Sequence, residues 1–279
     1  MRIARVKKDG KIGLAAKSGD AVTIAYGEDL ADLDAHISGG TLSEAGAKAA
    51  AGEAVDEAAL TFLPPVVRPS KIICLGLNYR DHAEESGLSI PEFPVLFARF
   101  PSSLMGHGAP IILPKVSKQL DWEAELAVVL SKGGKNIAEA DALNHVAGYS
   151  VFNDASIRDY QLRTPQWTAG KNFDDTGAFG PWLVTPEELP AGAAGLKIEC
   201  RVNGNVMQSS NTGNLIFSVA NTIHLLSTFM TLEAGDLLIM GTPGGVGVAR
   251  NPQVWMKAGD VCDVEIEGVG LLSNPIVAE

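Results

Sequence analysis

The sequence predicts an α+β protein that is mainly β, with a few helices and a small N-terminal α+β domain. The 279-residue chain is 46% hydrophobic and 20% charged, which is typical of globular proteins. Beyond residue 68, short apolar runs alternate with Gly, Pro and Asn turns, as in β-rich folds. Clear helical periodicity is confined to a few stretches.

A domain boundary is expected near residue 67. The segment "LPPVVRPS" contains prolines that cannot continue a helix. We therefore predict a small N-terminal domain over 1–67 and a larger, catalytic domain over 68–279. In the first, Asp9-Gly10 is expected to form a hairpin turn, and the Ala-rich stretch 42–60 a helix.

The large domain is expected to contain many strands and a few helices. The clearest helical stretches are 137–148, ending at Gly148, and 214–230, where apolar residues recur at three- and four-residue steps. The expected strands are short apolar runs bounded by turn residues: 71–79, 94–100, 121–130, 148–154, 180–185, 196–204, 236–241 and 260–270.

Charge and cysteine content exclude several classes of protein. A formal net charge of -11 argues against nucleic acid or an anionic membrane surface as a partner. No apolar run approaches the ~20 residues of a membrane span, and no signal peptide is apparent, so we expect a soluble, cytoplasmic protein. Cys74, Cys200 and Cys262 form no CxxC pattern and are expected to be core residues.

Three acids alternate along the expected strand "DWEAELAVVL", residues 121–130. Asp121, Glu123 and Glu125 would share one face of this strand. Buried carboxylates repel each other and are costly unless they are paired or bound to a cation. Either this is an edge strand with one face in water, or its carboxylates have positive partners.

A second polar group follows the strand that ends near Asp154. If a helical turn comes next, Asp154, Arg158 and Gln161 fall at i, i+4 and i+7 on one face. The alternative is that Asp154 caps the helix and Arg158 is exposed. Carboxylates from two strands would form an all-oxygen set, which suits Mg²⁺ or Mn²⁺ better than zinc.

Three further motifs are candidates for chemistry. His82 and Glu85 could form a general base, although a surface pair is the simpler reading of HxxE alone. Lys171 follows Gly170, where backbone could approach a ligand closely. The segment "GTPGGVG", 241–247, lacks the ending of a P-loop and suits a turn that offers N–H groups and Thr242 to an anion.

The remaining histidines have no supporting partners in the sequence and are expected to be structural. They are His36, His107, His145 and His224.

Together these motifs closely resemble the fumarylacetoacetate hydrolase family, in the branch of acylpyruvases and related diketo-acid hydrolases. The resemblance extends from Lys71 to Pro275, with the motifs in family order, and residues 1–67 resemble the variable N-terminal unit of that branch. It rests on "KIICLGLNYRDHAEESG", "LDWEAELAVVL", "GYSVFNDASIRDYQ", "GKNFD", "VNGNVMQSSNT", "GDLLIMGTPGGVG" and "AGDVCDVEIEGVGLLSNPI".

The resemblance implies a fold and a role for each candidate residue. The fold would be a fumarylacetoacetate hydrolase-like β-roll of mixed sheets, assembled as a homodimer. Asp121 is not a ligand in the family pattern. The implied roles are metal ligands for Glu123, Glu125 and Asp154; a water-activating dyad on a mobile lid for His82 and Glu85; a cation beside the reacting carbonyl for Lys171; and substrate binding for Arg158, Gln161 and Thr242.

The chain departs from the family pattern at two places. Family members often carry a lysine at the position of Arg99, and an aromatic or small apolar run at Asp175-Thr176-Gly177. Both departures are expected near the substrate pocket.

The resemblance implies a Mg²⁺-dependent hydrolase that cleaves a carbon-carbon bond in a ketonic substrate. The substrate would be a small anionic 2,4-diketo acid, of acylpyruvate or 2,4-diketo-3-deoxy sugar acid type, and the products pyruvate and a second acid. Mn²⁺ also fits the site, and Ca²⁺ fits it less well. The rivals are a decarboxylase, keto–enol isomerase, hydratase or lyase acting on a related 2-keto acid, and a non-catalytic metal-stabilised binding protein.

Overall fold

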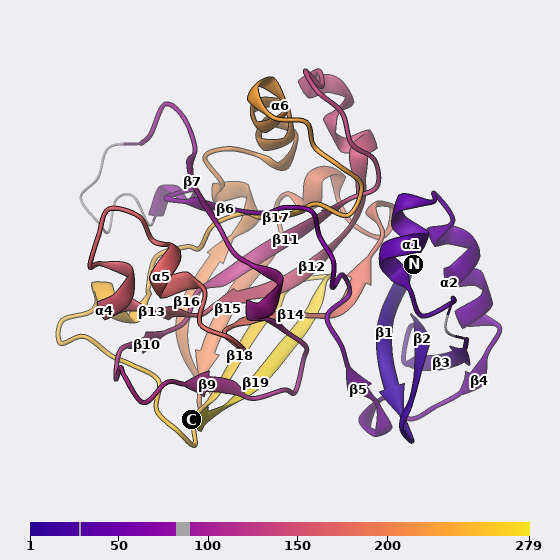
Figure 1. The fold of residues 1–279 in the computed structure, drawn as a ribbon, viewed down its shortest axis with the longest axis horizontal. Helices are drawn as coiled ribbons and strands as arrows, with labels where there is room; N and C mark the ends of the chain where they lie inside the picture. The colour runs from indigo at the N-terminus through magenta and orange to yellow at the C-terminus, as the bar shows by residue number, and fades with distance from the viewer. Residues whose placement is uncertain (28, 82–89) are drawn as a thin grey trace.

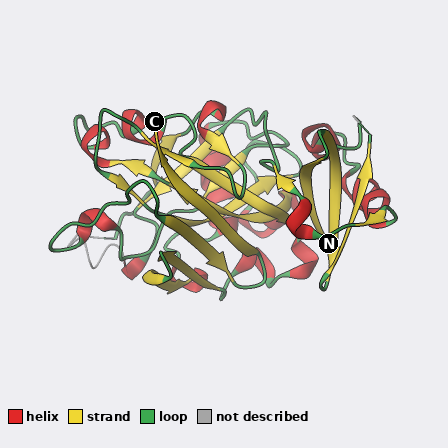
Figure 2. Cartoon of the chain, turned by 90° about the horizontal axis from the view of Figure 1, so that it is seen from below, coloured by secondary structure: helices red, strands yellow, loops and turns green. Residues whose placement is uncertain are grey.

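The computed structural model describes residues 1–27, 29–81 and 90–279. In these ranges the chain forms sheets of twelve, five and two strands, and no helix exceeds the eleven residues of α6 (Val219–Phe229). Figure 2 shows strands running through the body of the molecule with short helices around them. The predicted mainly β class with mixed sheets and few helices is confirmed. No helix in these ranges is both long and apolar enough to cross a bilayer.

The N-terminal part forms a small antiparallel sheet with two helices, on the right in Figure 1. The predicted hairpin is confirmed, because Asp9 and Gly10 turn with φ of 48° and 80° between β1 and β2. The elements are β1 (Arg2–Lys8), β2 (Lys11–Ser18), β3 (Ala21–Tyr26), α1 (Leu33–Ser38), α2 (Leu42–Ala50), β4 (Glu53–Ala54) and β5 (Thr61–Phe62).

The predicted helix 42–60 is wrong beyond Ala50. After α2, the residues Glu53 and Ala54 pair with β3 instead of continuing the helix. Gly52 makes this turn possible, since a Cβ atom there would lie only 2.1 Å from the backbone oxygen of Ile24. Close backbone approach therefore outweighed the helical propensity of the alanines.

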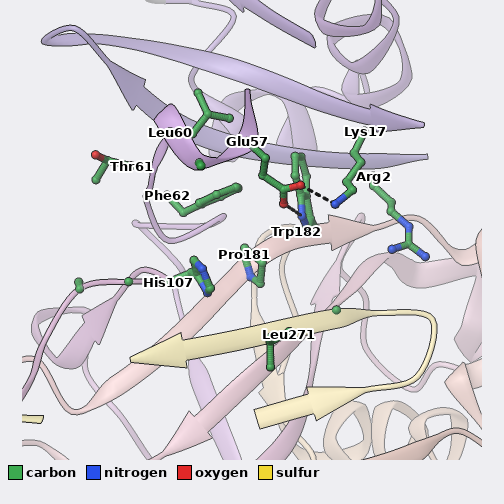
Figure 3. A pocket seen from close by; sticks show the side chains of 14 residues that line it. Arg2, Lys17, Glu57, Leu60, Thr61, Phe62, His107, Pro181, Trp182 and Leu271 are labelled. Carbon is green, nitrogen blue, oxygen red and sulfur yellow. Dashed lines mark hydrogen bonds and ion pairs between the residues drawn. The ribbon is translucent and has the colours of Figure 1, made fainter. Parts of the chain in front are cut away.

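The N-terminal sheet is continuous with the main sheet. β1 pairs with β14 (Gly177–Val184) through Arg2 opposite Val184 and Ile3 opposite Leu183. A cavity of about 580 Å³ lies beside this junction, and Phe62, His107 and Trp182 are among its lining residues (Figure 3). The division at residue 67 stays a prediction, since the two parts share one sheet.

The central strand of the main sheet is β11 (Ala124–Leu130). The strand order is β14-β12-β11-β17-β6-β7, and every residue of β11 is buried. Its two faces contribute to different core clusters, with Leu126 and Val128 in one and Ala127 and Val129 in the other. The edge-strand alternative is therefore wrong. The neighbours are β6 (Ile72–Gly76), β7 (Val95–Ala98), β12 (Val146–Asp154) and β17 (Leu237–Ile239).

The five-stranded sheet packs against β11, β12 and β14. Cys200 and Cys262 lie on its neighbouring strands with their Sγ atoms 3.7 Å apart, and all three cysteines are buried and free, as predicted. In spatial order the strands are β16 (Asn205–Asn211), β15 (Lys197–Val202), β18 (Val261–Ile266), β19 (Gly270–Ala278) and β9 (Ile111–Leu113).

Both predicted helices of the large domain are shorter than expected. The stretch 137–148 forms only a 3₁₀ helix over Glu139–His145, and β12 begins at Val146. The second helix, α6, begins at Val219 because the Ser218 side chain caps it, accepting a hydrogen bond from Asn221 N at 3.2 Å. The first stretch thus loses its last residues to β12, and the second loses its first residues because the helix cap lies at Ser218.

Candidate metal centre

The predicted strand 121–130 is interrupted near its beginning, at residues 122 and 123. Asp121 ends β10 (Leu120–Asp121), which pairs with β13 (Ser156–Ile157), and β11 begins only at Ala124. In the gap, Glu123 N donates to Asn153 Oδ1 at 3.1 Å. The backbone oxygen of Glu123 accepts from Asp154 N at 3.0 Å. These bonds place Glu123 opposite the end of β12.

Three buried carboxylates meet at this point. Glu123, Glu125 and Asp154 each offer an oxygen, and these oxygens all lie within 4.8 Å of one another. Glu123 is 6% exposed, Glu125 1% and Asp154 0%. An all-carboxylate donor set of this kind suits a hard divalent cation. The three residues could therefore hold such an ion, as the resemblance implies.

Glu125 provides a test of that fit. Its Oε2 accepts a hydrogen bond from Gly241 N at 2.5 Å, and among the described residues no cationic side chain forms an ion pair with it. Burial, followed by the charges of Asp154 and Glu123, raises the pKa of Glu125 well above its ordinary value. A buried carboxylate without a compensating charge is what a cation-binding cluster requires.

Lys171 lies between two of the three carboxylates. It ends α5 (Thr168–Lys171), and its Nζ is 2.6 Å from Glu123 Oε2 and 2.7 Å from Asp154 Oδ2. Burial alone would lower the pKa of Lys171, but the Asp154 and Glu123 carboxylates outweigh burial and raise it. Burial likewise acts to raise the pKa of Glu123, but Lys171 and Arg158 outweigh it and lower this pKa to about 2.

Arg158 links the cluster to two further polar residues. Its Nε lies 2.8 Å from Asp121 Oδ2, its Nη2 2.7 Å from Glu123 Oε1, and its Nη1 2.8 Å from Gln161 Oε1. The predicted helical face 154–158–161 is wrong, because Asp154 ends β12 and α4 (Arg158–Gln161) begins only after β13. The capping alternative is also wrong, since Ile157 occupies the N-cap.

Asp121 lies outside the cluster, and its carboxylate is occupied. Oδ1 accepts from Trp122 N at 2.9 Å and from Gly247 N at 2.7 Å. Oδ2 accepts from Val248 N at 2.9 Å and from Arg158 Nε. This residue therefore serves to orient Arg158.

The "GTPGGVG" loop binds anions that belong to the protein itself. Gly241 N donates to Glu125, and Gly247 N and Val248 N donate to Asp121. Its Thr242 hydroxyl accepts from Gln208 Nε2 at 2.8 Å. The N–H groups of the expected turn thus bind the carboxylates of Glu125 and Asp121, whereas Thr242 contacts an amide and no anion.

Gly170 also has a different use from the one expected. A Cβ atom at this position would lie 2.4 Å from the backbone nitrogen and from the Cβ of Gln161. The glycine therefore allows α5 to pack directly on α4, which brings Lys171 and Arg158 to the same cluster. Its neighbour is protein backbone, not a ligand.

A pocket of about 180 Å³ opens onto the cluster. Leu77, Phe97 and Trp167 form part of its apolar wall, and Phe97 also lies under Lys171, whose Nζ is 4.9 Å from the ring centroid. Six of the predicted site residues line the pocket: Glu123, Glu125, Arg158, Gln161, Lys171 and Thr242. Asp154 joins them through the cluster, whereas His82 and Glu85 lie outside the described residues.

Sequence reasoning missed two supporting residues and did not find the partner of a third. Asn153 holds Glu123 N, and Gln208 holds the β11 end by accepting from Ala124 N at 2.9 Å. No spacing signal marked these amides, since both contacts join segments far apart in the chain. Arg99 was expected near the pocket; it does not line the pocket itself but binds Asp154 of the adjoining cluster.

Comparisons with known proteins place the chain in a family. Residues 71–277 match the model described as fumarylacetoacetate (FAA) hydrolase C-terminal. "Oxaloacetate tautomerase Fahd2a, mitochondrial" from Rattus norvegicus is 48% identical over 219 residues, covering 78% of this chain and 70% of that protein. Because that relative is described as mitochondrial, a cytoplasmic location for this chain stays a prediction.

Solved structures agree over the full length. The fumarylacetoacetate hydrolase from Exiguobacterium antarcticum has a TM-score of 0.88 at 32% identity, covering 100% of both chains. The 5-carboxymethyl-2-hydroxymuconate delta-isomerase from Mycobacterium smegmatis has a TM-score of 0.80 at 30% identity, covering 100% of this chain and 99% of that one. The chain is an enzyme of the fumarylacetoacetate hydrolase family.

Proposed function

We propose that this enzyme interconverts the keto and enol forms of a short 2-keto dicarboxylic acid such as oxaloacetate. The observation that carries the proposal is Lys171 Nζ, held between Glu123 and Asp154 at the wall of a small pocket. A relative described as an oxaloacetate tautomerase, at 48% identity, supports the choice of reaction.

The pocket suits a compact, anionic substrate. Its volume of about 180 Å³ is below the ~300–1,000 Å³ of drug-sized sites. Arg158 and Lys171 supply positive charge at one side, and Gln161 and Thr242 supply neutral polar groups. We propose that Arg158, Gln161 and Thr242 hold the carboxylate and keto oxygens of the substrate.

We propose Mg²⁺ as the resident ion, with Glu123, Glu125 and Asp154 as its ligands. A divalent cation bound there would supply Lewis-acid polarisation of the 2-keto group. Mn²⁺ would support the same role, because it shares the preference for carboxylate oxygens.

Tautomerisation moves one proton between C3 and the C2 oxygen of the substrate. The raised pKa of Lys171 keeps its ammonium protonated, so Nζ–H can donate to the oxygen that becomes the enol. We propose the His82 and Glu85 pair as the base that exchanges the proton at C3. A base and an acid on opposite sides of the enolate suffice for this reaction, and no bond between carbon atoms breaks.

A second candidate is hydrolysis of the C3–C4 bond in a 2,4-diketo acid. Two observations favour it: the HxxE pair could activate water, and the chain is similar over its full length to a fumarylacetoacetate hydrolase. Water would add to the C4 carbonyl, the C3–C4 bond would break, and C3 would take up a proton. The products would be pyruvate and a second acid.

Product analysis separates the candidates. The enol form of oxaloacetate is followed by its ultraviolet absorbance with Mg²⁺-loaded protein, after chelation, and with Glu125→Gln. A coupled lactate dehydrogenase assay detects pyruvate in parallel, and is repeated with acylpyruvates. We expect rapid, chelator-sensitive enol conversion without pyruvate. Pyruvate from an acylpyruvate would favour the hydrolase, pyruvate from oxaloacetate would indicate a decarboxylase, and no change in any substrate would overturn both proposals.

We also propose that the enzyme is a homodimer. The family resemblance is the basis of this proposal, and size-exclusion chromatography with light scattering tests it. A mass equal to that of one chain would contradict it.

A further inference from the structure

Arg99 is a buried arginine that binds the back of the candidate metal cluster. It follows β7, is 2% exposed, and forms an ion pair through Nη1 with Asp154 Oδ1. The same Nη1 lies 3.3 Å from the backbone oxygen of Ala155. Its Nε donates to Ser103 Oγ at 3.2 Å, and its Nη2 donates to Thr176 Oγ1 at 2.7 Å. Each of its three nitrogens therefore has a fixed partner.

Gly177 provides the space that this guanidinium occupies. A Cβ atom at position 177 would lie 3.0 Å from Arg99 Nε, 3.0 Å from Arg99 Nη2 and 3.1 Å from the backbone oxygen of Ser103. Contacts at this distance would force the guanidinium to move by a few tenths of an ångström. The two departures from the family pattern, at Arg99 and at 175–177, are thus in direct contact.

The two oxygens of Asp154 have different neighbours. Oδ1 binds Arg99, whereas Oδ2 faces Lys171 Nζ at 2.7 Å inside the cluster. A carboxylate held at one oxygen by a buried guanidinium cannot rotate freely.

We propose that Arg99 is a positioning residue for the metal centre. It fixes the Asp154 carboxylate so that Oδ2 is the oxygen offered to the cation, and Thr176 and Gly177 form the socket that an arginine needs at this position. A lysine would retain the charge but could not bind Asp154, Ser103 and Thr176 together, since a single ammonium has no planar fork. The inference rests on the metal centre of the proposed function.

The experiment is a Mn²⁺ titration of the full chain by calorimetry, with far-UV circular dichroism to confirm folding. It compares the wild type with Arg99→Lys, Gly177→Ala and the double variant. We expect Arg99→Lys to weaken Mn²⁺ binding by about 10–100-fold, the usual effect of losing a residue that orients a ligand. The matched control is Arg201→Lys, whose ion pairs with Glu199 and Glu265 lie on the five-stranded sheet, and it should bind Mn²⁺ like the wild type.

The double variant tests whether the effect of Gly177→Ala on Mn²⁺ binding depends on Arg99. Gly177→Ala should weaken Mn²⁺ binding in the wild type by about tenfold, a coupling within the usual range for contacting residues. In the Arg99→Lys background it should cause a clearly smaller loss, because the contacts with Nε and Nη2 no longer exist. The clash with Ser103 oxygen is present in both backgrounds and cancels in the comparison.

Two results would overturn the inference. If Arg99→Lys binds Mn²⁺ as tightly as the wild type, or if Gly177→Ala has the same effect in both backgrounds, Arg99 does not position Asp154. If the wild type itself binds no Mn²⁺, the metal centre fails and the role of Arg99 fails with it. The wild-type titration therefore distinguishes failure of the inference alone from failure of the proposed function.

Discussion

Asp121 Oδ2 accepts a hydrogen bond from Arg158 Nε at 2.8 Å, while Arg158 Nη2 lies 2.7 Å from Glu123. The first residue thus orients the second toward the pocket without belonging to the three-carboxylate cluster. These separate roles can be tested, because the loss of the Asp121 carboxylate should affect substrate binding and metal binding differently.

Replacing Asp121 with asparagine should weaken substrate binding and spare the metal. The amide cannot act as a charged acceptor for Arg158 and the loop N–H groups at once, so we expect KM to rise by about tenfold, which corresponds to ~1.4 kcal/mol. Steady-state kinetics measure KM, and calorimetry measures Mn²⁺ affinity, which should stay close to that of the wild type because Asp121 binds Arg158 and loop N–H groups and is not one of the three carboxylates. A large loss of Mn²⁺ affinity with unchanged KM would show that Asp121 is a ligand.

Glu125→Gln should stabilise the metal-free protein and abolish its response to metal. The raised pKa of Glu125 shows that its charge is unfavourable in the folded state without a cation. Removing that charge should raise the metal-free Tm by a few degrees, as ~1 kcal/mol shifts Tm by about 2–4 °C in a chain of this size. Differential scanning calorimetry with and without Mn²⁺ measures both effects.

The control for this variant is Glu44→Gln, at an exposed position in the first turn of α2. It should leave the metal-free Tm and the Mn²⁺-induced shift as in the wild type. If Glu125→Gln lowered the metal-free Tm, the carboxylate would be a stabilising group and the cluster would not need a cation.

Lys171→Met should separate catalysis from metal affinity. The Lys171 ammonium competes with any cation for Glu123 and Asp154, so its removal should tighten Mn²⁺ binding. Turnover should fall by about 10²–10³-fold, as for the loss of one donor to a developing oxyanion. Parallel titrations and single-turnover assays test the two effects, and weaker Mn²⁺ binding would count against the competition.

The periodicity of the sequence identified two of the three carboxylates but left an exposed edge strand open as the alternative. Alternation in 121–130 predicted Glu123 and Glu125 on one side of a strand; Glu125 does lie on β11, whose faces contribute to two core clusters, but Glu123 lies just before that strand. Short apolar runs bounded by turn residues can be recognised from neighbouring residues alone. The mainly β class could therefore be predicted from the sequence. Family resemblance then supplied Asp154 as the third carboxylate.

Other features depended on contacts between distant segments. The helix expected over 42–60 ends early because Gly52 packs against the backbone of Ile24. Likewise, Arg99 meets Asp154, 55 residues away in the chain, and fills the space left by Gly177. Local patterns contain no information about such pairs, so sequence reasoning identified the residues as departures without finding their partners.

His107 should make the stability of the protein depend on pH at the junction of the two parts (Figure 3). Its Nδ1 accepts a hydrogen bond from Ser273 N at 3.0 Å, and its ring packs edge-to-face on Phe62 at 5.4 Å. Burial lowers the pKa of His107, although Glu57 and Asp263 oppose the effect. The folded state therefore favours the neutral ring.

The sign of the dependence follows from proton counting. Below the ordinary histidine pKa of about 6.5, the unfolded chain binds a proton that the folded chain resists, so the free energy of unfolding falls as the pH drops. Above that value both states are neutral at His107, and its contribution is complete. Urea unfolding at about pH 7.5 and about pH 5.5 should show a larger loss of stability in the wild type than in His107→Gln. Glutamine can accept the Ser273 hydrogen bond and does not titrate, so His107→Gln serves as the pH-insensitive control. Equal losses of stability in the two proteins would mean that protonation of His107 costs nothing in the folded state.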